Sequence, residues 1–320
     1  MSRDRREVTG ASVVIAARDA EDTLGATLAG LAAQDFDGAF EVIVVDDSSA
    51  DATREVALAS ELEITIVTGA GLGPGPARNR GVAAAHGAAL AFIDADCVPD
   101  RGWLRAGVAA LAEAELVQGL VRADFAALAG PFDRTIWATS ETGLYECASL
   151  FVTREVFERI GGFDDWLEVG SGKPLAEDAW FGWRARRSGA RSSFSEQAAV
   201  SHAVFRRGAL AHVGERARCV YFPSIVSKMP ELRRTLLFAG VFLNRRTASF
   251  DLALGATALA VRRRSPLALV LAAPWLALVG AGARPWGRRA PAVAAIESVA
   301  DGVTCVSLVA GSIRSRCLVL

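Results

Sequence analysis

The sequence predicts an α/β protein with a mostly parallel sheet flanked by helices, followed by a block of apolar helices. Short apolar runs alternate with amphipathic segments through the first 100 residues, at the spacing of right-handed β–α–β units. Several of these runs are apolar without interruption, which is typical of strands buried on both faces of a parallel sheet. After residue 235 the sequence becomes predominantly apolar and arginine-rich, which predicts a different kind of structure there.

The first elements follow from these runs and from helix-end signals. Leu24, Leu28 and Leu31 repeat on one helical face, and Pro76 suits the first turn of a helix. The predicted strands are 12–17, 41–45, 64–67 and 88–93, and the predicted helices are 23–34, 52–60 and 76–86.

Beyond residue 100 the alternation becomes irregular. Gly161 and Gly162 end one predicted helix, because glycine readily adopts the left-handed conformation of a helix C-terminus. The predicted helices are 103–113, 154–160 and 175–187, and the predicted strands are 116–121, 147–152 and a short run over 200–204.

Composition limits the possible functions. The chain has 320 residues and a net charge of −1, so its length allows one large domain or two, and no global positive field points to nucleic acid. The five cysteines include no C-x-x-C pair, which favours reduced thiols over a disulfide framework or a zinc site. The first nine residues are charged, so we expect no secretory signal there.

An acidic pair closes the fourth predicted strand. Asp94 and Asp96 follow the apolar run Ala88–Ile93, and a period of two would point both carboxylates the same way. Ligands of open α/β sheets bind beyond the carboxyl ends of the strands. Paired carboxylates suit Mg²⁺ or Mn²⁺ that also holds substrate phosphates. The alternative is a simple turn that caps the strand, as we expect for the chain's other D-x-D, at residues 35–37.

The glycine-rich segment 69–76 lies between a predicted strand and a predicted helix, where dinucleotide-binding loops occur. In every frame the third glycine of G-x-G-x-x-G falls on Pro74, Pro76 or Arg78. We therefore expect a loop that joins strand to helix, and no nicotinamide or flavin site.

Four later features are candidates for a site. Asp178 lies in the first turn of a predicted helix, where the helix dipole favours a carboxylate, although an ordinary helix-start acid is the alternative. His202 is either a ligand or a structural histidine. The loop 163–174 is rich in aromatic and acidic residues and could cover a site. Trp103, Trp166 and Trp180 could stack on a bound ligand or belong to the core.

The last third of the chain predicts membrane association. Residues 265–283 are uncharged, contain Pro274 and have arginines at both ends. Cations at both ends favour a hairpin or an interfacial insertion with both ends on the cytoplasmic side. Residues 291–312 are apolar but carry Glu297 and Asp301 on one face. The alternative is a buried helical subdomain of a soluble protein.

Taken together, the ordered motifs resemble family 2 of the glycosyltransferases, which has the GT-A fold. The motifs are Ser12–Ala17, Val44–Thr53, Gly75–Gly81, Phe92–Asp96, Ile160–Asp164 and Glu177–Asp178. The resemblance covers roughly residues 10 to 220, and the apolar tail is similar to those of several bacterial members. It implies a GT-A catalytic domain over residues 1–232 and a membrane-associated helical region over 233–320.

The resemblance also implies roles for the donor-binding residues. Ala17 and Asp47 would line the nucleotide base and ribose, with Asp46 nearby. Arg78 would help to hold the nucleotide-sugar, and Asp94 would face its sugar and ribose.

The remaining implied roles concern the metal and the proton. Asp96, with Asp94 beside it, would bind the divalent metal that bridges the two phosphates, and His202 would be a further metal or phosphate ligand. Asp178 would be the general base. The Gln-x-x-Arg-Trp motif of processive members is missing, so the resemblance implies transfer of one sugar at a time.

The resulting hypothesis is an inverting, Mn²⁺- or Mg²⁺-dependent transfer of one sugar from a nucleotide-diphosphate sugar to a hydroxyl acceptor. The acceptor would be lipid-linked or a cell-envelope glycan, and the reaction would take place at the cytoplasmic face of the cell membrane. The alternatives are a polyprenyl-phosphate glycosyltransferase, which would use a phosphate acceptor, and a non-catalytic nucleotide-sugar-binding protein.

Overall fold

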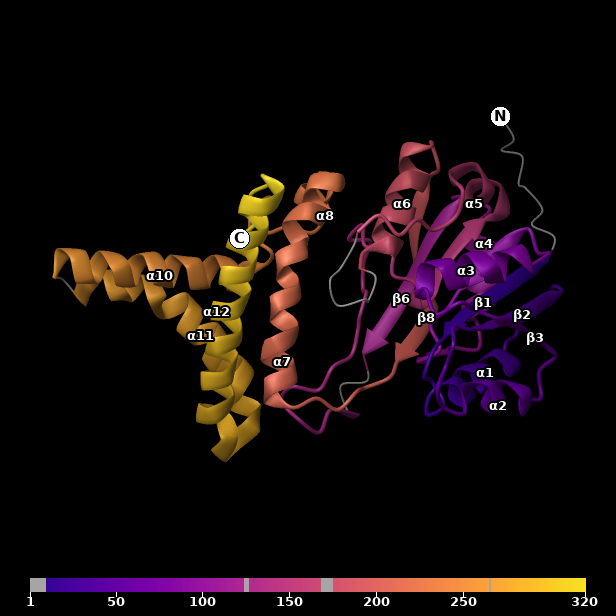
Figure 1. Cartoon of the computed structure of the whole chain (residues 1–320), viewed down its shortest axis with the longest axis horizontal. Helices are drawn as coiled ribbons and strands as arrows, with labels where there is room; N and C mark the ends of the chain where they lie inside the picture. The colour runs from indigo at the N-terminus through magenta and orange to yellow at the C-terminus, as the bar shows by residue number, and fades with distance from the viewer. Residues whose placement is uncertain (1–9, 124–126, 168–174, 265) are drawn as a thin grey trace. The chain divides into compact units, whose positions relative to one another are not determined.

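The chain forms two compact units in a computed structural model that describes residues 10–123, 127–167, 175–264 and 266–320 (Figure 1). The first unit consists of Met1–Ala126 and Thr135–Val204, and the second of Ala127–Arg134 and Phe205–Leu320. This division lies upstream of the functional boundary between residues 232 and 233 that the sequence suggested.

The first unit is built on an eight-stranded sheet in the order β3-β2-β1-β4-β7-β6-β8-β5. Its first half is parallel, and each strand matches a predicted one within two residues. These strands are β1 (Ala11–Ala17), β2 (Phe40–Asp46), β3 (Ile64–Thr68) and β4 (Ala89–Phe92). Ala17 pairs with Asp46, so the carboxyl ends of β1 and β2 meet at one edge.

The second half of the sheet is mixed. It contains β5 (Cys97–Pro99), β6 (Leu116–Ala123), β7 (Leu150–Thr153) and β8 (Ser192–His202). β7 is antiparallel to β4 and β6, β8 is parallel to β6, and β5 is antiparallel to β8. The three-residue β5 was not predicted, and β8 is far longer than the expected run at 200–204. The class prediction, α/β with GT-A architecture and apolar C-terminal helices, is confirmed.

The alternation of side chains along the strands divides the core between two faces. Val13, Ile15 and Val44 share a buried cluster with residues of α1 (Leu24–Ala32) and α4 (Trp103–Ala110). The intervening residues face α3 (Pro74–Ala83), where Gly81 lies so close to Val14 that an added Cβ would be 2.4 Å from its methyl group. Strands buried on both faces therefore explain the uninterrupted apolar runs.

An aromatic cluster extends this second face toward the later helices. The Phe92 ring contacts Phe157 of α5 (Arg154–Ile160), Phe181 of α6 (Glu177–Arg187) and Phe163 between them. The Phe163 and Phe181 rings stack with centroids 4.3 Å apart. This packing fixes the start of α6 close to the end of β4. The short helices α2 (Thr53–Leu58) and η2 (Cys147–Ser149) complete the described part of the unit's helical set.

The second unit is helical. Its elements are α7 (Ala209–Glu215), η3 (Arg216–Tyr221), α8 (Phe222–Lys228), α9 (Leu232–Thr235), α10 (Arg245–Arg263), η4 (Pro266–Ala272), α11 (Ala273–Ala283), η5 (Arg284–Arg289) and α12 (Ala290–Ser315). By length and composition alone, the helical run Leu267–Ser315 is long and apolar enough to cross a bilayer, and 17% of its most apolar window is buried. The run is not one straight helix, because Gly287 has non-helical backbone angles.

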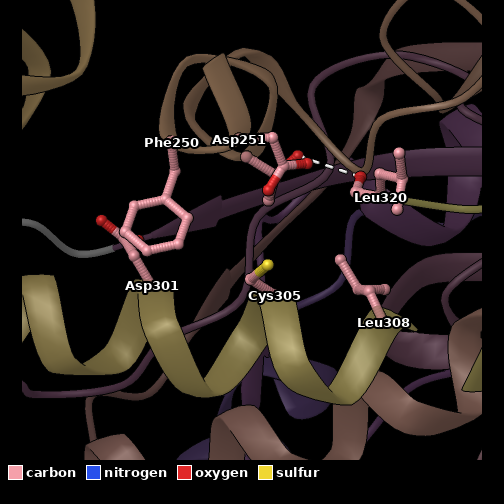
Figure 2. A pocket seen from close by; sticks show the side chains of 7 residues that line it. Phe250, Asp251, Asp301, Cys305, Leu308 and Leu320 are labelled. Atoms are coloured by element: carbon pink, nitrogen blue, oxygen red, sulfur yellow. Dashed lines mark hydrogen bonds between the residues drawn. The ribbon is translucent and has the colours of Figure 1, made fainter. Parts of the chain in front are cut away.

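A small pocket lies between α10, α12 and the last residue of the chain (Figure 2). The side chains of Phe250, Asp251 and Cys305 line it, and the Leu320 carbonyl accepts a hydrogen bond of 3.1 Å from Thr247. The Leu320 amide also donates to the Val241 carbonyl at 2.9 Å. The chain terminus is thereby attached to the start of α10.

Gly107→Ala tests the packing of α4 on the sheet. An added Cβ would lie 2.1 Å from the buried Phe151 ring, so we expect a loss of about 1–3 kcal/mol in the free energy of unfolding. Gly25→Ala in α1 is the matched control, since its nearest neighbour would be an ordinary contact at 3.7 Å. Urea unfolding measures both, and equal stability of the two variants would contradict the packing.

Candidate functional site

Asp94 and Asp96 lie in the turn between β4 and β5. The expectation that they continue a strand with parallel side chains is therefore wrong, because β4 ends at Phe92 and the Asp94 carbonyl accepts the Cys97 amide at 3.1 Å. Both side chains are half-buried, with 29% and 27% of their surface exposed. Burial and the neighbouring Asp94 raise the pKa of Asp96. Two carboxylates this close favour a cation between or beside them.

His202 is brought to Asp96 by the pairing of β5 with β8. Cys97 pairs with His202, and the Nε2 atom of His202 lies 3.5 Å from Oδ2 of Asp96. On the other side of the ring, Nδ1 lies 2.7 Å from the Ala203 carbonyl. A proton on Nδ1 would bind this carbonyl and leave the Nε2 lone pair directed at the acidic turn, as metal-binding histidines require.

The residues that could hold a metal ion are Asp96, Cys97 and His202, whose ligand atoms lie within 4.8 Å of one another. Burial raises the pKa of the Cys97 thiol well above its usual range, which disfavours the thiolate that binds metals. A carboxylate oxygen suits Mg²⁺ or Mn²⁺, and an imidazole nitrogen suits transition-metal ions. The geometry thus fits a divalent cation on Asp96 and His202.

Arg78 connects the acidic turn to the start of α6. Its guanidinium is 4% exposed, and Nη2 donates to Oδ1 of Asp94 at 2.7 Å while Nη1 lies 3.6 Å from Oε1 of Glu177. The Phe163 ring lies 5.5 Å below the guanidinium carbon. Burial disfavours the cation, but the surrounding acids, Asp94 and Asp178 among them, outweigh it and raise the pKa of Arg78. Arg78 is therefore a fixed cation.

The start of α6 presents two carboxylates. Ala176 precedes them with φ = 64°, a left-handed conformation unusual for a non-glycine residue. Glu177 is buried, and burial with the charge of Asp178 raises its pKa to about 8 despite Arg78. Asp178 is more exposed, and its Oδ2 accepts the Cys147 amide at 3.2 Å. Of the two, Asp178 is the one open to a substrate.

Glu146 adds a further carboxylate beside Asp178. Burial and the charge of Asp178 raise the pKa of Glu146 to about 7. Its backbone carbonyl accepts a hydrogen bond from Gln118, which holds it against the sheet. No sequence motif marked Glu146, because its proximity to Asp178 arises only when η2 packs beside α6.

The predicted nucleotide-binding residues gather at the ends of β1 and β2. Ala17 is buried at the end of β1, and its carbonyl accepts the Asp47 amide at 2.8 Å. Both carboxylate oxygens of Asp47 accept backbone amides of the glycine-rich loop, from Gly71 and Gly73, at 2.8 Å. Asp46 accepts the Ser49 amide at 3.0 Å. Asp47 thus holds the loop that leads into α3 and Arg78, which sequence reasoning did not anticipate.

The predicted covering loop is described as far as residue 167, and its remainder, 168–174, lies outside the described residues. Phe163 exchanges two backbone hydrogen bonds with the Asn79 side chain, at 2.8 and 2.9 Å. Trp103 is fully buried and donates to Ser149, so it belongs to the core. Trp180 is also buried and donates to Asp164 at 3.1 Å.

The structure therefore links the sequence-predicted residues into two neighbouring groups. Asp96, His202 and Asp94 form the first group, and Arg78 joins Asp94 to Glu177 and Asp178 in the second. Ala17, Asp46 and Asp47 lie at the adjoining strand ends. The roles assigned to these residues stay predictions.

The chain is similar in sequence to known glycosyltransferases. Residues 12–146 match the family model described as Glycosyl transferase family 2. "Glycosyltransferase AglE" of Haloferax volcanii is 32% identical over 146 residues, which are 41% of this chain and 48% of that protein. "Pre-mycofactocin glycosyltransferase" of Mycobacterium tuberculosis is 28% identical over 180 residues, 50% of this chain and 37% of that protein. The chain thus spans less than half the length of these curated relatives.

Two solved structures share the fold across most of the chain. The mannosyltransferase PcManGT of Pyrobaculum calidifontis, in complex with GDP-Man and Mn²⁺, has a TM-score of 0.57 at 22% identity and covers 98% of this chain and 89% of its own. S. aureus TarS 1-349, in complex with UDP-GlcNAc, has a TM-score of 0.52 at 18% identity, with coverage of 97% and 93%. Identities this low establish the fold alone.

Glu146→Gln should flatten the pH dependence of stability in the metal-free protein. A carboxyl whose pKa is raised by folding favours the native state when protonated, so its contribution is lost as the pH rises from 4.5 to about 7. The glutamine cannot titrate, so the decline across this window should shrink by at most about 3 kcal/mol. Urea unfolding at several pH values measures the slope.

Glu196→Gln, an exposed change on β8, is the control and should leave the slope as it is. A Glu146→Gln protein with the parental slope would show that this carboxyl is not held in the buried environment described.

Proposed function

We propose, from the premise that residues 12–146 are a glycosyl transferase family 2 segment, that this protein transfers a single sugar from a nucleotide-diphosphate sugar to a hydroxyl group of an acceptor. The reaction is metal-dependent and inverts the anomeric centre. The observation that carries the proposal is the Arg78 bridge, which sets the acidic turn at Asp94 beside the carboxylates of Glu177 and Asp178. A cation site and a proton acceptor thus share one site.

The donor half of the site consists of the acidic turn and the adjoining strand ends. Asp96 and His202 would hold Mn²⁺ or Mg²⁺, which when bound supplies positive charge to the departing diphosphate. Asp94 is oriented by Arg78 and faces the sugar and ribose. The printed titles of the two fold neighbours, with GDP-Man and Mn²⁺ and with UDP-GlcNAc, support this class of donor and metal.

The acceptor half centres on Asp178. Its carboxylate is positioned by the Cys147 amide, and it accepts the proton of the attacking hydroxyl. Glu146 and Glu177 retain protons toward neutral pH, which limits the negative charge crowded around it. One base acting opposite the leaving group gives a single displacement, and hence inversion.

The second unit is the basis for proposing that the reaction takes place at a membrane. Its exposed apolar helices support a lipid-linked or cell-envelope acceptor at the cytoplasmic face of the cell membrane. Three arginines would favour a phosphate acceptor, Arg206, Arg207 and Arg218, and two of them are already paired, Arg206 with Asp133 and Arg207 with Glu215. The polyprenyl-phosphate alternative is less well supported for this reason.

Asp178→Asn should abolish turnover and keep donor binding. Loss of a general base typically lowers the rate by about 10²–10⁴-fold, whereas the donor contacts lie on the other half of the site. Turnover is measured as donor hydrolysis or transfer, and binding by thermal stabilisation with a panel of nucleotide-sugars. Asp22→Asn, an exposed change, is the control. A protein that binds donors but shows no turnover before mutation is a non-catalytic binder, and the proposal fails.

Asp96→Ala should remove the Mn²⁺-dependent part of donor binding. Calorimetric titration with a donor selected from that panel, with and without Mn²⁺, should show a loss of about 10²-fold or more. Asp37→Ala in the chain's other D-x-D is the matched control, because Asp37 is exposed on a loop. Unchanged Mn²⁺-dependent affinity in Asp96→Ala would disprove the metal assignment.

A further inference from the structure

The C-terminal unit exposes large apolar side chains along α10, η4, α11 and α12. In the described part of this unit, the most exposed of them include Val261 at 75%, Leu267 at 78% and Ile313 at 76%. Others are Leu252, Leu254, Leu259, Leu269, Val270, Leu271, Leu276, Leu278, Val299, Val306 and Val309. A water-exposed surface seldom carries this many neighbouring leucines and valines.

The same unit holds one polar cluster among its buried apolar residues. Arg246 of α10 pairs with Glu297 at 2.8 Å and with Asp301 at 2.9 Å, both on α12. Nε2 of His212 lies 3.1 Å from Glu297, and the Trp275 indole donates to Asp301 at 2.8 Å. These ionisable side chains are between 5% and 29% exposed. The unit's acidic groups are thus held in partly buried ion pairs, while many of its leucines and valines remain exposed.

Arginines interrupt the apolar surface at two places. Residues 252–296 contain no acidic residue and six arginines, so the segment carries a charge of +6. Arg262, Arg263 and Arg264 lie at the end of α10, and Arg284, Arg288 and Arg289 lie in η5. All six are exposed, and none forms an ion pair with a carboxylate within the described ranges.

The charges around the apolar helices favour a surface position over a crossing. η4 and α11 follow one another directly and together have 18 residues, close to the ~20 that a spanning helix needs, so length alone does not decide. Arginines flank the stretch from η4 to α11 at both ends. α12 is longer, but its Glu297 and Asp301 are bound to α10.

We infer that the surface formed by residues 252–289 binds the headgroup layer of an anionic phospholipid bilayer. The six arginines contact lipid phosphates, and the exposed leucines enter the boundary with the acyl chains. A symmetric dimer through this surface is disfavoured, since two segments of charge +6 repel each other. The inference rests on the proposed location of the sugar transfer at a membrane and specifies the lipid class.

Vesicle binding tests the inference with the full chain. Flotation is measured with phosphatidylcholine vesicles and with phosphatidylcholine–phosphatidylglycerol vesicles. We expect affinity for the anionic vesicles to be about tenfold higher or more, and to fall as salt is added. Equal affinity for the two vesicle types would overturn the inference.

Two matched pairs of substitutions locate the surface. Arg263→Gln with Arg264→Gln should lower affinity for anionic vesicles about tenfold and leave phosphatidylcholine binding unchanged. Arg54→Gln with Arg101→Gln removes the same charge from exposed positions of the first unit and should change neither. An equal loss in both pairs would overturn the assignment to residues 252–289.

The double substitution Leu267→Gln and Leu271→Gln tests whether the exposed leucines contact lipid. It also tests whether they instead bind a second copy of this chain. Both side chains are exposed, at 78% and 47%, so we expect the fold to persist, as circular dichroism can verify. Binding to both vesicle types should weaken. If the substitutions instead abolish self-association in sedimentation and leave vesicle binding intact, the surface is an interface between copies and the inference is wrong.

These outcomes are independent of the sugar-transfer proposal. Donor hydrolysis of Arg263→Gln with Arg264→Gln should equal that of the parent in the absence of vesicles, because both residues lie in the second unit. Selective loss of lipid binding with intact hydrolysis supports the inference. If the parent protein shows no preference for anionic vesicles, the inference is overturned, even when Asp178→Asn loses turnover and keeps donor binding.

Discussion

The buried guanidinium of Arg78 holds the candidate site together. It donates to Asp94 from the turn after β4 and lies 3.6 Å from Glu177 at the start of α6, residues 83 positions apart in the sequence. Taking one partner out of a buried ion pair costs about 3–5 kcal/mol, because the remaining charge is left without compensation. The arrangement is therefore fixed before any ligand arrives, and a preorganised site needs little rearrangement during reaction.

The loop and helix around Arg78 show how its position is secured. Asp47 binds two amides of the glycine-rich loop that leads into α3, and Asn79 binds the backbone of Phe163. The Phe163 ring in turn packs under the guanidinium and against Phe181 of α6. The residues of one short helix thus reach three parts of the site, which explains why the motif Gly75–Gly81 is compact in sequence.

The parallel half of the sheet and its helices could be predicted from sequence because burial on both faces leaves uninterrupted apolar runs. β5 could not be predicted, since a three-residue strand carries almost no periodicity and exists only because β8 pairs with it. β8 was underestimated because Ser193, Ser195 and Glu196 interrupt its apolar pattern. The same pairing brings His202 to Asp96. The family resemblance suggested His202 as a ligand, but it did not predict this contact with Asp96.

The two carboxylates Asp178 and Glu146 differ in how far they could be predicted from sequence. Asp178 stood in a recognisable position at a helix start, whereas Glu146 had no local signal at all. Its raised pKa results from burial and from Asp178, and both depend on how η2 packs beside α6. Sequence patterns report periodicity and helix ends, but electrostatic coupling depends on distances between residues far apart in the chain. Such couplings emerge only after the fold is known.

Charge is distributed unevenly along the chain. The net charge of the chain is −1 and residues 252–296 contribute +6, so the rest of the chain carries −7. An anionic bilayer therefore attracts this segment and repels the remainder, which contains the acidic site. A site built from carboxylates would be repelled by the same lipids unless a separate cationic segment supplied the attraction. In the proposed function the cationic segment and the acidic site are separate, so the segment keeps the sign that attracts anionic lipids and the site keeps the carboxylates that would bind a cation.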